Sequence, residues 1–120
     1  MNPAELFRQD SDAVQIAPGD FLFREGDKRD VAYVLLEGEV EIRLGDYVVE
    51  TAKPGALIGE MALIDDSPRA AGAVAKTAAK LAKIDKRRFL FLIQQTPNFA
   101  IHVMKELADR IRHMNAAAMR

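Results

Sequence analysis

The sequence of 120 residues predicts a mainly β, α+β fold in which a roll of short strands precedes two helices. Five turn signals punctuate the first two-thirds of the chain, about 7 to 12 residues apart: Pro18-Gly19, Glu25-Gly26-Asp27, Glu37-Gly38, Gly45-Asp46 and Pro54-Gly55. From about residue 85 the apolar residues follow the spacing of a helix instead. The length suits one domain, which we expect to span residues 1–120.

The expected strands lie between these turns and are rich in β-branched, aromatic and leucine residues, which favour strands. Val40–Leu44 alternates apolar and charged side chains, so one face of this strand is expected to be buried and the other wet. The remaining strands are expected over Phe21–Arg24, Val31–Leu36, Tyr47–Thr51, Ala71–Lys76 and Lys80–Asp85. Short strands at regular intervals indicate a sandwich, a barrel or a roll, which we place at residues 13–85.

Two helices are expected over residues 86–118. The first is short and amphipathic, and Thr96-Pro97 stops it, because the residue before a proline disfavours helical geometry. Its sequence signature is Phe89, Leu90, Ile93 and Gln94. The second begins near Pro97, and an apolar stripe runs along it at steps of three and four. The stripe consists of Met104, Leu107, Ile111, Met114 and Ala118. Such a stripe more often faces a core than an interface.

Composition excludes several classes of protein. Without cysteine the chain has no disulfide scaffold, thiolate metal site, iron–sulfur cluster or cysteine nucleophile. We find no apolar run near the length of a membrane span and no signal peptide, so we expect a cytoplasmic protein without a span. The first 66 residues hold 15 acidic and 6 basic side chains, and the rest hold 3 and 11. Either the two halves attract each other within one fold, or the basic half includes an anion site.

No pattern in the sequence assembles a catalytic site. The glycine spacing matches neither a P-loop nor a dinucleotide fingerprint. His102 and His113 are eleven residues apart on one expected helix, too far to bind one metal ion. Ser11 and Ser67 lack the context of a nucleophile. We therefore expect no catalytic residue, no metal and no cofactor, and interpret the chain as a binding module rather than an enzyme.

The most informative segment is residues 55–71. Gly59 follows a strand that ends at Ile58, and a glycine there permits close approach of the backbone to another group. A short helical turn over Glu60–Ile64 would direct free N–H groups toward an anion. Arg69 lies just beyond and can reach the same anion through charge-assisted hydrogen bonds. The pattern predicts a phosphate site.

Gly59-Glu60-Met61-Ala62-Leu63, followed by Pro68-Arg69-Ala70-Ala71, resembles the phosphate-binding cassette of the cyclic nucleotide-binding domain family. That family includes protein kinase A regulatory subunits, catabolite activator-type regulators and cyclic nucleotide-gated channels. The resemblance extends over about residues 13–118, for example to the turns at Pro18-Gly19-Asp20 and Glu37-Gly38-Glu39. It implies a double-stranded β-helix, a jelly-roll-like β-roll, with a short cassette helix within residues 58–71 and C-terminal helices.

The resemblance also implies roles for individual residues. Arg69 would pair with the exocyclic oxygens of the cyclic phosphate, and Glu60 would accept the ribose 2′-hydroxyl. Ala70 stands where a hydroxyl residue accompanies cGMP preference, so alanine favours cAMP while cGMP stays open. Asn115 either bonds the purine edge or is solvated. Further contacts are expected from Gly59, Met61, Ala62 and Ala71.

The resulting expectation is a sensor that binds cAMP and passes the signal to the C-terminal helices. Its output would require a homodimer through the C-terminal helix or an unidentified effector protein. Two departures from the family, Ile58 for an aromatic residue and Gly72 for a β-branched one, would loosen the packing of the cassette. The alternatives are a degenerate roll that serves as a protein-interaction scaffold, or the sensor part of a larger transcription regulator, kinase or channel. Direct nucleic-acid binding by this chain is not expected.

Overall fold

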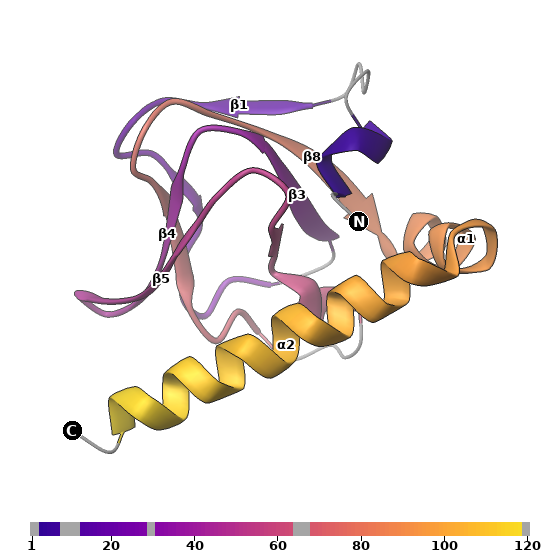
Figure 1. Ribbon diagram of the computed structural model, residues 1–120. Coiled ribbons are helices and arrows are strands. Elements are labelled where there is room, and N and C mark those ends of the chain that lie inside the picture. Colours follow the sequence, from indigo (N-terminus) through magenta and orange to yellow (C-terminus); the bar gives the residue numbers. More distant parts are fainter. Residues whose placement is uncertain (1–2, 8–12, 29–30, 64–67, 119–120) are drawn as a thin grey trace.

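A computed structural model describes residues 3–7, 13–28, 31–63 and 68–118 of the protein (Figure 1). Within these residues, eight strands form two antiparallel four-stranded sheets, and two α-helices follow them. This arrangement confirms the predicted β-roll with C-terminal helices. Ile64, Asp65, Asp66 and Ser67, the end of the predicted cassette turn, lie outside the described residues.

The strands of each sheet are far apart in the sequence, as expected when a chain winds into a roll. One sheet has the order β1 (Val14–Ile16), β8 (Ala79–Asp85), β3 (Val31–Glu37) and β6 (Leu57–Ile58). The other has the order β2 (Phe21–Phe23), β7 (Gly72–Ala75), β4 (Val40–Leu44) and β5 (Tyr47–Ala52). The six strands whose ranges were predicted are found with bounds that differ by at most one residue at either end. β6 ends at Ile58, as expected, and β1 was not predicted. The winding brings β6 and β7, which flank the cassette, into different sheets.

The strict alternation of burial predicted for β4 is wrong. Val40 is buried and Leu44 is exposed, but the three residues between them are all half-buried. The charged pair Glu41 and Arg43 accounts for this, because an Arg43 Nη2 to Glu41 Oε1 contact of 2.5 Å folds both side chains along the sheet. Their apolar stems therefore cover surface that the alternation would have left to water.

The core consists of two clusters on opposite faces of the first sheet. Val34 and Leu35 are adjacent on β3, and both are fully buried. Because successive side chains of a strand point to opposite faces, Val34 packs into the cluster under the helices and Leu35 into the cluster between the sheets. β3 is thus buried on both faces, which explains its continuous apolar sequence.

In the described residues, two short 3₁₀ helices and two α-helices accompany the strands. The 3₁₀ helices are η1 (Pro3–Phe7) and η2 (Glu60–Leu63), the second of which lies in the cassette. α1 (Lys86–Gln95) begins after Asp85, whose carboxylate accepts the Arg88 N–H at 2.7 Å as an N-cap. α2 (Pro97–Ala118) begins at Pro97, as predicted, and lies across one end of the roll (Figure 1).

The predicted core stripe of α2 is wrong in part. Leu107 packs against the core as predicted, but Met104 is 55% exposed and Ile111 is 58% exposed, and Phe99 and Val103 enter the core instead. The helix carries two apolar stripes at similar spacing, and the roll covers only the one that contains Phe99. The side chains of Met114 and Ala118 lie outside the described part of the chain. Leu90 on α1, expected in the signature of an amphipathic helix, is 57% exposed.

Candidate functional site

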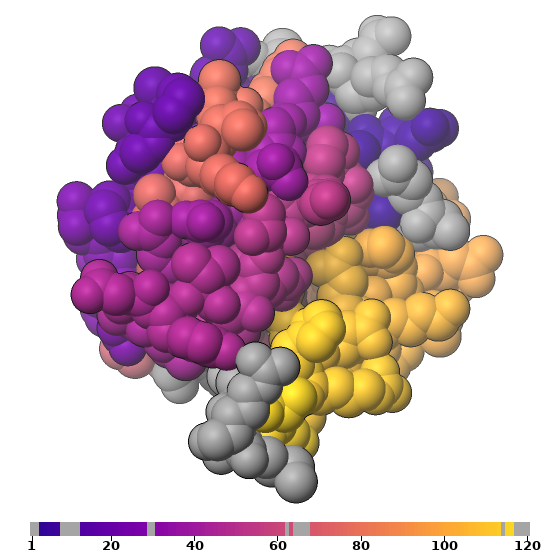
Figure 2. Space-filling model, turned by 60° about the vertical axis from the view of Figure 1, so that its left-hand side comes forward, coloured from indigo at the N-terminus to yellow at the C-terminus, as the bar shows by residue number. Residues whose placement is uncertain are grey.

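A cavity of about 160 Å³ lies where the cassette, the β4–β5 hairpin and α2 meet, and we call it the cassette cavity. Figure 2 shows the C-terminal part of α2 beside the magenta surface of β5. Six of the predicted site residues line this cavity: Gly59, Glu60, Met61, Arg69, Ala70 and Ala71. The other lining residues are Phe23, Ile42, Leu44, Val49, Glu50 and Arg110. The fold thus brings together two segments of the cassette that the sequence separates.

Arg69 is held firmly at the wall of the cassette cavity, with only 5% of the residue exposed. Its guanidinium donates to the carbonyl oxygen of Val31 at 2.7 Å and to that of Gly59 at 3.2 Å. The guanidinium carbon also lies 4.0 Å from the centre of the Phe23 ring, which is cation–π geometry. Its backbone N–H donates to the carbonyl oxygen of Asp27 at 2.7 Å. Arg69 is therefore a buried residue of the cavity wall and not a surface side chain.

Gly59 makes this placement of Arg69 possible. Its φ of +72° lies in the left-handed region, which glycine adopts without steric penalty. A Cβ atom on Gly59 would overlap Nη1 of Arg69 and lie 3.3 Å from a carbon of the Phe23 ring. Both the backbone conformation and the space beside the guanidinium therefore require glycine here.

Glu60 is 5% exposed and forms an ion pair with Arg110 of α2. The same guanidinium lies 2.7 Å from Glu50 Oε1 and 3.5 Å from Glu106 Oε2, and it donates to the carbonyl oxygen of Leu57. Burial alone would lower the pKa of Arg110, but the charge of Glu60, and then Glu50, raises it above its usual value. Arg110 thus stays a cation that joins the cassette, β5 and α2.

Sequence reasoning missed Arg110. The available signal was its spacing: Phe99, Val103, Glu106 and Arg110 follow one another at helical steps of four, three and four. This places Arg110 and Glu106 on the face that carries the buried residues of α2. A charged residue on a buried face needs a partner, and the acidic first half of the chain supplied candidates. No pattern in the sequence indicated which carboxylates they would be.

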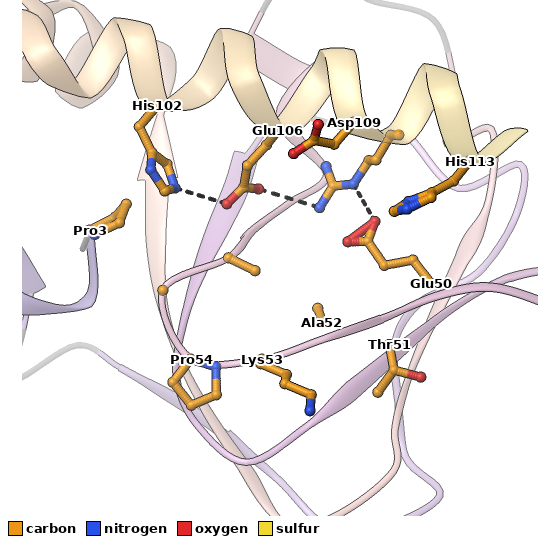
Figure 3. A pocket seen from close by; sticks show the side chains of 13 residues that line it. Pro3, Glu50, Thr51, Ala52, Lys53, Pro54, His102, Glu106, Asp109 and His113 are labelled. Carbon is orange, nitrogen blue, oxygen red and sulfur yellow. Dashed lines mark hydrogen bonds and ion pairs between the residues drawn. The ribbon is translucent and has the colours of Figure 1, made fainter. Parts of the chain in front are cut away.

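A second cavity, of about 410 Å³, is also lined by Arg110, and we call it the helix cavity (Figure 3). His102, Glu106, Asp109 and His113 of α2 face the turn after β5 across it. Further lining is provided by Pro3, residues 50–56 and Arg110. Glu50 and Arg110 line both cavities, so the two sites share one ion-pair network.

Glu106 is the central acid of the helix cavity. Its Oε1 lies 2.8 Å from Nε2 of His102, and its Oε2 accepts the Leu57 N–H at 2.8 Å. Burial raises the pKa of the Glu106 carboxyl, and the Leu57 N–H, Arg110 and His102 oppose that rise. The ionised form of Glu106 therefore depends on these three partners.

Two predicted contact residues are placed differently from the rest. Asn115 is exposed on α2 and is not among the residues that line the cassette cavity. Ala62 lies in η2, and its side chain is outside the described part of the chain. In the described residues we find no group of three metal-ligating side chains. No described helix combines the length and apolar character needed to cross a membrane.

The fold and the cavity define a β-roll domain that encloses a buried arginine and glutamate beside a C-terminal helix. The sequence profile of the family described as the cyclic nucleotide-binding domain matches residues 13–96. The chain belongs to this family.

Known relatives include both kinase subunits and bacterial regulators. The chain is 37% identical over 89 residues to a cAMP-dependent protein kinase regulatory subunit of Emericella nidulans, an alignment that covers 72% of this chain and 22% of the subunit. The chain thus spans about a fifth of that relative's length.

Two solved structures extend the likeness over almost the whole chain. One is the c-di-GMP-responsive global regulator CLP of Xanthomonas campestris, with a TM-score of 0.83 and 25% identity over 97% of this chain and 61% of that one. The other is the catabolite activator protein of Thermus thermophilus, with a TM-score of 0.74 and 26% identity over 94% of this chain and 61% of that one.

Proposed function

We propose that this chain is a single sensor unit that binds a cyclic nucleotide in the cassette cavity, with cAMP preferred. The proposal is carried by one observation: the two halves of the cassette meet at one cavity with Arg69 and Glu60 both buried in its wall. Arg69 would bind the exocyclic oxygens of the cyclic phosphate. Glu60 would accept the ribose 2′-hydroxyl, and backbone groups of Gly59, Met61 and Ala62 would complete the contacts.

The size of the cassette cavity suggests how such a ligand would lie. At about 160 Å³ it is smaller than the roughly 300–1,000 Å³ usual for small-molecule pockets. The enclosed part therefore suits the ribose and cyclic phosphate, while the base would lie toward the β4–β5 hairpin and α2. The apolar Ile42, Leu44 and Val49 on the hairpin wall would contact the base.

Arg110 explains how the carboxylate of Glu60 could lie beside a bound phosphate. Two anions close together repel each other strongly in a site of low dielectric constant. The ion pair between Glu60 and Arg110 compensates the carboxylate before ligand arrives. The proposed role is binding, in keeping with relatives that are themselves named as regulatory proteins.

Calorimetric titration of the purified protein with cAMP, cGMP and c-di-GMP tests this function. We expect saturable binding, tightest for cAMP because Ala70 adds no hydroxyl to the wall. Arg69→Ala is expected to weaken it about 10- to 100-fold, since charge-assisted hydrogen bonds contribute roughly 1.5–3 kcal/mol. Arg24→Ala is the matched control, because Arg24 also lies over a phenylalanine ring, that of Phe21 at 3.7 Å, and does not line the cassette cavity.

The outcomes separate the proposed sensor from its alternative. Equal weakening in Arg24→Ala would mean that the effect is not specific to the cassette. If the folded wild-type protein binds none of the three nucleotides, the roll is a scaffold for protein interaction. Binding of cGMP or c-di-GMP in preference to cAMP would contradict the proposed ligand but would still support the cassette cavity as a nucleotide-binding site.

We further propose that α2 pairs with α2 of a second copy of this chain. Its outer face has heptad spacing: the exposed Ile101, Met104 and Ile111 and the half-buried Ala108 occupy alternating core positions, and Asn115 occupies the next one. A single asparagine at such a position fixes register in coiled coils. We expect the two helices to be parallel. Lys105 and Arg112 flank the stripe on one side, and in an antiparallel pair these cations would lie next to the same cations of the partner helix.

Ile111→Glu is expected to convert a dimer into a monomer, because it places a charge within the apolar seam. Leu90→Glu is the matched control, since Leu90 is equally exposed but lies on α1. Light scattering over a range of protein concentrations measures the mass in solution and distinguishes a dimer from a monomer. A monomeric wild-type protein, or a dimer that survives Ile111→Glu, would contradict pairing through α2.

A further inference from the structure

The charged side chains on the inner face of α2 form a continuous series from the helix cavity to the cassette. His102, Glu106 and Arg110 occupy successive turns of the helix, and each contacts the next (Figure 3). Arg110 then contacts Glu60, the glutamate of the cassette. A change of charge at the His102 end can therefore reach the cassette through two side chains, without any movement of the backbone.

Glu106 is the shared member of this series. One of its oxygens contacts His102, and the other is divided between the Leu57 N–H and Arg110. A carboxylate that neutralises a protonated imidazole attracts a neighbouring guanidinium less strongly. Protonation of His102 therefore shifts the balance of Arg110 away from Glu106 and toward Glu60 and Glu50.

We propose that His102 and Glu106 are positioning residues for the cassette cavity, acting on Glu60 through Arg110, so that affinity for a cyclic nucleotide rises when His102 is protonated. This inference rests on the proposed function. Two effects have the same sign. First, Arg110 is attracted less by Glu106 and therefore compensates the charge of Glu60 more completely. Second, the positive charge of the protonated His102 itself favours an anionic ligand.

Other charged groups face the helix cavity and need to be counted. The turn after β5 contributes Lys53, and β5 contributes Glu50, which Arg110 already binds. On α2, Asp109 lies 2.7 Å from Arg112. η1 contributes Pro3, which carries no charge on its side chain. His102 is the imidazole that contacts Glu106 and, through it, Arg110. His113 also lines the cavity but is exposed.

Binding of cAMP to the full chain, measured by calorimetry from about pH 8 to about pH 6, tests the inference, because imidazoles gain their charge in that range. The wild-type protein is expected to bind roughly three- to fivefold more tightly at the acidic end, as screened unit charges several ångströms apart would produce. His102→Gln retains a hydrogen-bond donor for Glu106 but cannot titrate, so its affinity should be independent of pH. Glu106→Gln interrupts the series but leaves His102 able to gain a charge, so its affinity should depend on pH less steeply than that of the wild-type protein.

His113→Gln is the matched control, and it should keep the pH dependence of the wild-type protein. Thermal unfolding of each variant at both ends of the range identifies any loss that is due to folding. Equal wild-type affinities at the two pH values, or a pH dependence that survives His102→Gln, would overturn this inference and leave the proposed function intact. Failure of the wild-type protein to bind any cyclic nucleotide would overturn both.

Discussion

Replacing Arg110 by methionine is expected to lower the free energy of unfolding by about 3–5 kcal/mol, because it leaves buried carboxylates without their cation. The guanidinium compensates Glu60 and Glu50 at the same time and lies within 3.5 Å of Glu106. Methionine fills a similar volume, so the expected loss is electrostatic rather than a loss of packing. Denaturant unfolding monitored by circular dichroism measures it.

Controls on the same helix make this prediction specific. Arg112→Met removes an arginine whose side chain is 72% exposed and which pairs with Asp109, so it should change stability by less than about 1 kcal/mol. Adding Glu60→Gln to Arg110→Met removes one uncompensated charge and should restore part of the loss. If Arg110→Met is as mild as Arg112→Met, the ion-pair network does not stabilise the fold.

The pH dependence of the Arg110→Met variant has a definite sign. Without Arg110, the pKa of Glu106 should rise further above its usual value, because burial is then opposed by fewer partners. A carboxyl whose pKa is raised on folding contributes stability at low pH and loses it as the pH rises through the raised pKa. The deficit of the variant should therefore be smaller in mildly acidic solution than at neutral pH.

Gly59→Ala is expected to weaken nucleotide binding as strongly as Arg69→Ala and to destabilise the fold as well. The new methyl group would occupy the position of Arg69 Nη1, so the guanidinium must leave its carbonyl partners on Gly59 and Val31. The left-handed backbone at residue 59 adds a cost of roughly 1–2 kcal/mol for a residue with a Cβ. Calorimetry with cAMP and thermal unfolding measure the two effects separately.

Gly45→Ala separates the two causes. Gly45 also has a positive φ, of +59°, but a Cβ there would meet no atom within 4 Å. This variant should lose stability to a similar degree through its backbone and retain wild-type affinity. If Gly59→Ala binds cAMP as tightly as Gly45→Ala does, the position of Arg69 does not determine affinity.

The cassette was predictable from the sequence because its recognised residues lie close together. Glu60 and Arg69 are nine positions apart, and short-range spacing is what a sequence displays. Arg110 lies 50 residues beyond Glu60 on a separate helix, so its ion pair depends on how α2 docks against the roll. The position of α2 against the roll depends on tertiary packing, and the helix propensity of its residues carries no information about that packing.

The choice between the two faces of α2 could not be predicted for a related reason. Met104 and Ile111 share one apolar stripe, while Phe99 and Val103 share another, and both have helical spacing. Hydrophobicity alone does not rank them. In the structure, Phe99 is fully buried in one cluster with Val34, Leu57 and Ile84.

The stacking of Arg69 on Phe23 has a kinetic and entropic consequence. A free arginine samples many rotamers, and immobilising such a side chain on association costs about 0.5–1.5 kcal/mol. Here the ring and two carbonyl oxygens select one rotamer as the chain folds. In the proposed function, an incoming phosphate would therefore meet a guanidinium that is already oriented, and association would not require that side chain to change rotamer first.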